Sequence, residues 1–138
     1  MLHHSIFVTD DDQSYVDLIT ALLIQAGYPN TVGHVGDDAF LRICDAHPDL
    51  VLLGVNSPNT LRDWTTLNAL RYHLSTHHIP IILCSATLPL KAMADVLRRS
   101  NCHALEKPFT RRALLEKVMA AFDTSTVDSG NRTRAVAE

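Results

Sequence analysis

Short apolar runs alternate along the chain with longer stretches in which apolar residues recur at helical spacing. Five runs are predicted to be strands, and they cover residues 5–8, 31–35, 50–53, 79–84 and 103–106. The stretches between and after them repeat apolar residues every three or four positions, which predicts amphipathic helices. Leu50-Val51-Leu52-Leu53 is apolar throughout, which is typical of a strand buried on both faces. Strand–helix alternation over about 120 residues predicts an α/β fold, with a parallel sheet covered by helices on both faces.

Local signals place several helix ends. Asp12 is positioned to cap the first helix, and Gly27 is suited to ending it. Pro89 suits the first turn of the fourth helix. Thr110 is predicted to cap the last helix, whose inward residues should be Leu114, Leu115, Val118, Met119 and Phe122.

Length and composition indicate one globular domain. The chain has 138 residues, of which 46% are hydrophobic and 20% charged. We expect residues 1–123 to form the folded domain and residues 124–138, which are polar and lack a period, to form a tail or linker. Twelve basic and fifteen acidic residues give a net charge of −3, which argues against direct binding to nucleic acid.

Neither a membrane segment nor a zinc site or disulfide framework is indicated. No apolar run reaches the roughly 18 residues of a membrane span, and the start of the chain does not resemble a signal peptide, so we expect a cytoplasmic protein. The three cysteines form no CxxC pair, which disfavours disulfides and a zinc site. Cys44 and Cys84 lie in apolar stretches and are expected to be buried.

Chemically capable residues follow the predicted strands. In open parallel sheets, sites form beyond the carboxyl ends of the strands. Asp10, Asp11 and Asp12 follow the first strand, where a hard cation such as Mg²⁺ would balance them; a solvated helix N-terminus is the alternative. Ser85 follows the fourth strand and suits either a phosphoryl contact or a helix cap, and Lys107 follows the fifth.

These features in this order resemble the receiver domain of bacterial two-component response regulators. The matching segments are Asp10-Asp11, Pro48-Asp49-Leu50-Val51-Leu52-Leu53, Ser85-Ala86 and Lys107-Pro108-Phe109, and the resemblance spans about residues 4–123. It implies a flavodoxin-like (βα)5 three-layer sandwich with strand order 2-1-3-4-5. In this family a histidine kinase donates a phosphoryl group to an aspartate at the end of the third strand.

The resemblance assigns roles residue by residue. Asp10 and Asp11 match the acid pair that binds magnesium, and Asn56 matches the residue whose backbone carbonyl completes that metal site. Ser85 and Lys107 match the residues that contact the phosphoryl group. The proline after this lysine, Pro108 here, often follows a cis peptide bond in the family.

Two positions depart from the family pattern. Gly54 stands at the phosphoacceptor position, and glycine cannot form an acyl phosphate. Asp49 cannot replace it, because five residues of extended chain separate them by roughly 16 Å. Ala104 stands where the family carries its aromatic switch residue. We therefore expect a phosphorylation-independent receiver that is not an enzyme and requires no cofactor, with at most weak Mg²⁺ binding; noncovalent phosphate or Mg²⁺ binding remains an alternative.

The expected partners are proteins: a sensor kinase, another receiver or an output domain. The resemblance points to a homodimer face made by the fourth helix, the fifth strand and the last helix, within residues 90–123. These helices carry four arginines, which form either a binding site for an acidic partner or an ordinary solvated surface. They are Arg98, Arg99, Arg111 and Arg112.

A different class of protein is also compatible with the sequence. The first strand and the acids after it resemble the opening motif of haloacid-dehalogenase-type phosphatases, with Asp10 as nucleophile and Asp12 as acid/base. Ser85 and Lys107 would then hold phosphate. The final acid pair of that family has no counterpart after Lys107, which disfavours this alternative.

Overall fold

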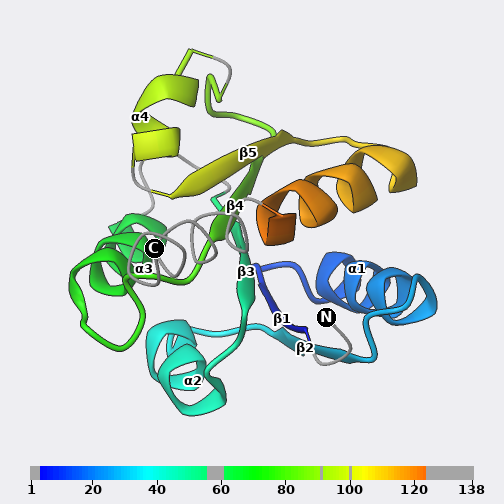
Figure 1. The fold of residues 1–138 in the computed structure, drawn as a ribbon, viewed down its shortest axis with the longest axis horizontal. Helices are drawn as coiled ribbons and strands as arrows, with labels where there is room; N and C mark the ends of the chain where they lie inside the picture. Colours follow the sequence, from blue (N-terminus) through cyan, green and yellow to red (C-terminus); the bar gives the residue numbers. More distant parts are fainter. Residues whose placement is uncertain (1–3, 56–60, 91, 100, 124–138) are drawn as a thin grey trace, which may run out of the picture.

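Five parallel strands form one sheet in the order β2-β1-β3-β4-β5 (Figure 1). The computed structural model describes residues 4–55, 61–90, 92–99 and 101–123. The strands are β1 (Ser5–Thr9), β2 (Asn30–His34), β3 (Leu50–Gly54), β4 (Ile81–Ser85) and β5 (Cys102–Glu106). This is the flavodoxin-like order that the resemblance implied, and the predicted tail, residues 124–138, lies outside the described residues.

Helices cover both faces of the sheet, as Figure 1 shows. α1 (Gln13–Gln25) and the helix of residues 111–123 pack on one face. The other face carries α2 (Ala39–Ala46), α3 (Leu61–Tyr72) and α4 (Ala94–Arg99). The predicted three-layer α/β architecture is therefore confirmed.

The central strand β3 divides the core into two apolar clusters. All five of its residues are buried, as its uninterrupted apolar sequence predicted. Leu50 and Leu52 pack with α1 and the helix of residues 111–123. Val51 and Leu53 point to the opposite face and pack with α2 and α3. Side chains alternate between the faces, so β3 contributes to both layers and fixes the backbone that leads to the carboxyl edge.

Capping residues lie at the starts and ends of helices largely where the sequence predicts them. The Asp12 side chain accepts a hydrogen bond of 3.2 Å from the Tyr15 backbone, and Thr110 Oγ1 accepts one of 3.0 Å from Ala113 N. Gly27, just after α1, has a φ of 110°, a conformation that L-residues rarely adopt. These caps position the chain segments that leave β1 and β5.

Three local expectations are wrong. α4 begins at Ala94 rather than near Pro89, and a hydrogen-bonded turn precedes it, in which Met93 N donates to the Pro89 carbonyl at 3.2 Å. Met119 is 57% exposed, because it lies at the edge of the inward stripe of its helix rather than within it. Cys84 is buried as expected, whereas Cys44 is only partly buried.

Candidate functional site

The predicted site residues that the structure describes meet at the carboxyl edge of the sheet. Asp10 directly follows β1, while Gly54 and Ser85 are the last residues of β3 and β4. The strand registers place Thr9 beside Leu53 and Gly54 beside Cys84. Parallel strands end at a common edge, so residues 30 or more positions apart in the sequence come together here.

Asp10 and Lys107 form a buried ion pair at this edge. The Lys107 ammonium donates to Asp10 Oδ2 at 2.7 Å, and Asp12 N donates to Asp10 Oδ1 at 3.2 Å. The Asp10 side chain is fully buried, and that of Lys107 is 16% exposed. Since a buried charge is costly without a partner, each of these groups requires the other.

The Asp10 carboxylate also occupies the space in front of Gly54. A Cβ atom at position 54 would lie 2.0 Å from Asp10 Oδ2 and 2.6 Å from its Cγ. Such distances are far shorter than van der Waals contact, so any side chain here requires Asp10 to move. Glycine at the end of β3 and the present position of Asp10 are therefore mutually dependent.

Tyr15 covers the lysine of this pair. Lys107 Nζ lies 4.0 Å from the centroid of the Tyr15 ring, and Phe109 packs edge-on against that ring at 6.3 Å. A cation over an aromatic face is attracted to the ring electrons. Burial raises the pKa of the Tyr15 hydroxyl, so it stays neutral. Sequence reasoning missed Tyr15, although its place three residues after the Asp12 cap puts it in the first turn of α1.

Ser85 acts as a cap for the loop that follows β4. Its hydroxyl is buried and accepts hydrogen bonds from Thr87 N at 3.1 Å and Leu88 N at 3.2 Å. These hydrogen bonds cap a loop rather than the helix that the sequence left open for Ser85, because α4 begins only at Ala94. The phosphoryl contact stays a prediction. The backbone of β4 also receives the lysine segment, because Lys107 N donates to the Ser85 carbonyl at 2.8 Å.

The described residues do not fit a magnesium centre in their present arrangement. Asp10 is directed to Lys107, and Asp11 is exposed. A small cavity of about 20 Å³ lies between these acids and Gly54, which is room for roughly one water molecule. No group of three or more metal-ligating side chains occurs among the residues that the structure describes, and Asn56, the predicted backbone ligand, lies outside them.

A polar network that the sequence did not reveal borders this edge at β2. Thr9 Oγ1 and His34 Nδ1 share a hydrogen bond of 3.1 Å, and His34 Nε2 lies 2.8 Å from Asp38 Oδ1. Arg42 Nε donates to Asp38 Oδ2 at 2.9 Å. The hydrogen bonds from His34 and Arg42 lower the pKa of Asp38 to about 2, so this carboxylate remains charged.

The other predicted positions are placed as follows. Asp49 lies at the opposite edge of the sheet, where its carboxylate accepts a hydrogen bond of 2.8 Å from Ser5 N. Ala104 lies on β5 and packs, half-buried, against the core cluster under α3 and α4. The peptide bond between Lys107 and Pro108 is cis, as the resemblance implied.

Comparison with known proteins establishes the family. Residues 6–119 match the response regulator receiver domain, and the chain therefore belongs to this family of two-component signalling proteins. No helix in the described ranges has both the length and the apolar character needed to span a membrane.

Solved structures show the same fold. A response regulator from Burkholderia multivorans is 27% identical, with a TM-score of 0.64 over 86% of this chain and 94% of that one. NtrX from Brucella abortus, solved with ADP, is 23% identical with a TM-score of 0.78. That match covers 95% of this chain but only 29% of the NtrX chain. The chemotaxis response regulator CheY4 of Vibrio cholerae is 19% identical, with a TM-score of 0.72 over 86% of this chain and 98% of that one.

Proposed function

We propose that this receiver domain signals by constitutive protein–protein recognition and is not phosphorylated. The observation that carries the proposal is the Asp10 carboxylate, held by Lys107 in the space before Gly54. Gly54 has no side chain that can form an acyl phosphate. The lysine that would contact a phosphoryl group in a family member instead neutralises a buried carboxylate. The domain is accordingly proposed to be a non-enzymatic module that requires no cofactor.

Receiver domains act through other proteins, such as kinases and output domains. For this chain we propose the face formed by α4, β5 and the helix of residues 111–123, through which a homodimer or an output domain would bind. β5 is the edge strand between these two helices (Figure 1). Met119 is 57% exposed on this last helix, and it offers apolar surface to a partner.

The basic residues on this side divide into paired and unpaired ones. Arg98 pairs with Asp95, and Arg112 pairs with Glu116 at 3.2 Å, within their own helices. Arg99 makes no ion pair within the described ranges of the chain. Paired arginines are partly neutralised, which weakens the case for a continuous acidic-partner site on this face.

Acetyl phosphate provides the direct test. The purified chain is incubated with acetyl phosphate and Mg²⁺, and its intact mass is measured beside a phosphorylatable receiver that serves as the positive control. We expect no added phosphoryl group on this chain and an unchanged oligomeric state in light scattering. A stable phosphoryl adduct would refute the proposal.

The phosphatase alternative has little support in the geometry. The Asp12 carboxylate, which would act as acid/base, caps α1 by accepting from Tyr15 N. Asp10, which would be the nucleophile, is held by Lys107. Hydrolysis of p-nitrophenyl phosphate that disappears in Asp10→Asn would revive this alternative.

A cytoplasmic location remains a prediction from the sequence.

A further inference from the structure

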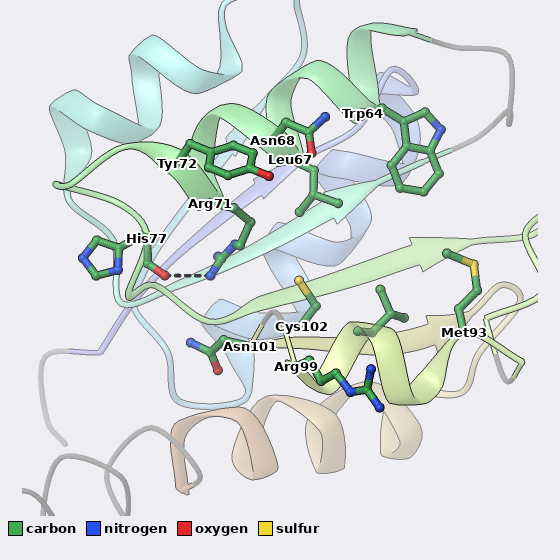
Figure 2. A pocket seen from close by; sticks show the side chains of 11 residues that line it. Trp64, Leu67, Asn68, Arg71, Tyr72, His77, Met93, Arg99, Asn101 and Cys102 are labelled. Carbon is green, nitrogen blue, oxygen red and sulfur yellow. Dashed lines mark hydrogen bonds between the residues drawn. The ribbon is translucent and has the colours of Figure 1, made fainter.

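A cavity separate from the Asp10–Lys107 site lies between α3 and α4. Its volume is about 530 Å³, within the range of about 300–1,000 Å³ found for small-molecule sites. Figure 2 shows side chains of the two helices facing each other across it, with Cys102 of β5 between them. It shares no lining residue with the small cavity beside Gly54.

One part of the cavity is apolar and aromatic. Trp64 and Leu67 come from α3, and Met93 and Leu97 from the turn before α4 and from α4 itself. In Figure 2, Trp64 and Met93 lie at the same end of the cavity. The Trp64 ring is only partly buried, and a flat apolar ring system placed against it would gain contact area.

The rest of the described lining is polar and includes two arginines. Arg71 and Arg99 line the cavity together with Asn68, Tyr72, His77 and Asn101, and no Asp or Glu is among the lining residues that the structure describes. The Arg71 Nη atoms donate to the carbonyls of His77 at 2.8 Å and Ile79 at 2.5 Å, which fixes the guanidinium in place. Its Nε is buried and has no hydrogen-bond partner among the described residues. Arg99 makes no ion pair with an acidic residue in the described part of the chain.

We propose that this cavity binds a small aromatic anion. The ring system would lie against Trp64 and Leu67, and a carboxylate or sulfonate would be held by Arg99, while Arg71 adds positive charge from its own side of the cavity (Figure 2). Guanidinium groups beside apolar walls favour a ligand that is both flat and negatively charged. A neutral aromatic compound satisfies only the apolar half of the site, and a purely polar anion satisfies only the basic half.

The chain carries its own reporter for this site, because Trp64 is its single tryptophan. The probe is 8-anilinonaphthalene-1-sulfonate, an aromatic anion whose excitation overlaps tryptophan emission. We expect saturable binding with quenching of Trp64 emission and energy transfer to the probe. N-phenyl-1-naphthylamine, its neutral analogue, should bind roughly tenfold more weakly, since it lacks the charge-assisted contact.

Two neighbouring arginines provide a matched pair of variants. Arg99→Gln should weaken binding of the anionic probe by about fivefold and leave binding of the neutral analogue unchanged. Arg98→Gln removes the same charge from the same helix, but Arg98 pairs with Asp95 and does not line the cavity, so it should have little effect. Circular dichroism and thermal unfolding are the controls that test whether both variants stay folded.

Three results of the direct binding measurements would overturn the proposal. They are equal affinity for the charged and neutral probes, equal loss in the two arginine variants, and probe binding that leaves Trp64 emission unchanged. Displacement of the probe by an acidic peptide but not by small aromatic carboxylates would also overturn it, in favour of a protein ligand. None of these outcomes depends on whether the domain accepts a phosphoryl group.

Discussion

The carboxylate of Asp10 lies where a side chain at Gly54 would have to begin. Oδ2 would be 2.0 Å from a Cβ atom at that position, and the same oxygen accepts a hydrogen bond from Lys107. The glycine and the ion pair thus form one packed unit at the carboxyl edge of the sheet.

The first prediction concerns a methyl group at position 54. Gly54→Ala should lower the free energy of unfolding by about 1–3 kcal/mol, because the new Cβ displaces the Asp10 carboxylate. In an Asp10→Ala background the same change should cost less. Urea unfolding of the wild type, both single variants and the double variant measures this coupling. Additive effects at the two positions would show that they are not in contact.

The same reasoning applies to an aspartate at this position. Gly54→Asp places a second carboxylate beside Asp10 in a buried space, so it should be less stable than Gly54→Ala. Phosphoryl uptake by Gly54→Asp would mean that Asp10 has moved away from Lys107 and that the remaining site is still competent. The intact mass of Gly54→Asp after treatment with acetyl phosphate shows whether a phosphoryl group has been added.

The second prediction concerns the lysine of the ion pair. Lys107→Ala should lower the free energy of unfolding by about 3–5 kcal/mol, because the fully buried Asp10 carboxylate loses its countercharge. Adding Asp10→Asn to Lys107→Ala should restore part of the loss. The matched control is Lys117→Ala on the last helix, since Lys117 makes no ion pair in the described ranges. An unchanged melting temperature in Lys107→Ala would contradict the role of the pair.

The third prediction concerns magnesium. Millimolar Mg²⁺ should raise the melting temperature by no more than NaCl of matched ionic strength does, because Asp10 is directed to Lys107 rather than to a metal. Lys107→Ala releases Asp10, so Mg²⁺ should stabilise that variant more than the wild type. A large Mg²⁺-specific shift in the wild type would show that the acid pair still forms a metal site.

The fourth prediction concerns acid stability at β2 and α2. The pKa of Asp38 is lowered to about 2 in the folded protein, below its ordinary value of 3.8, so its ionised form stabilises the fold. That contribution is fully present above pH 4 and is lost as the pH falls towards 2. The difference in melting temperature between the wild type and Asp38→Asn should therefore shrink between pH 4 and pH 2. Asp45→Asn, which removes an exposed acid of the same helix, is the matched variant for the change in net charge.

Hydrophobic patterning was sufficient to predict the fold because the inner strands β1, β3 and β4 are buried in a way that their sequences show. β3 is apolar throughout and is covered on both faces, and the caps at Asp12 and Thr110 have side chains that suit only a few roles. The start of α4 was not predictable in this way. Pro89 is compatible with either a helical turn or an isolated one, and local sequence does not distinguish them.

The site was predictable as a set of residues but not as a geometry. The order of motifs brought Asp10, Gly54 and Lys107 together, and an ion pair between the acids and the lysine follows from their charges. The position of the Asp10 carboxylate over Gly54 depends on a side-chain rotamer, which no sequence pattern encodes. The aromatic cover from Tyr15 likewise depends on how α1 is oriented relative to β5.

The interlocking of Asp10 and Gly54 has an evolutionary consequence. A side chain at position 54 first produces a less stable protein, because Asp10 must move to admit it, so a change towards phosphotransfer at this edge carries a cost in stability. Under the proposed function, the domain therefore remains in one conformational state. A cell would then tune its effect through the rate at which the protein is made and degraded rather than through chemical modification at this edge.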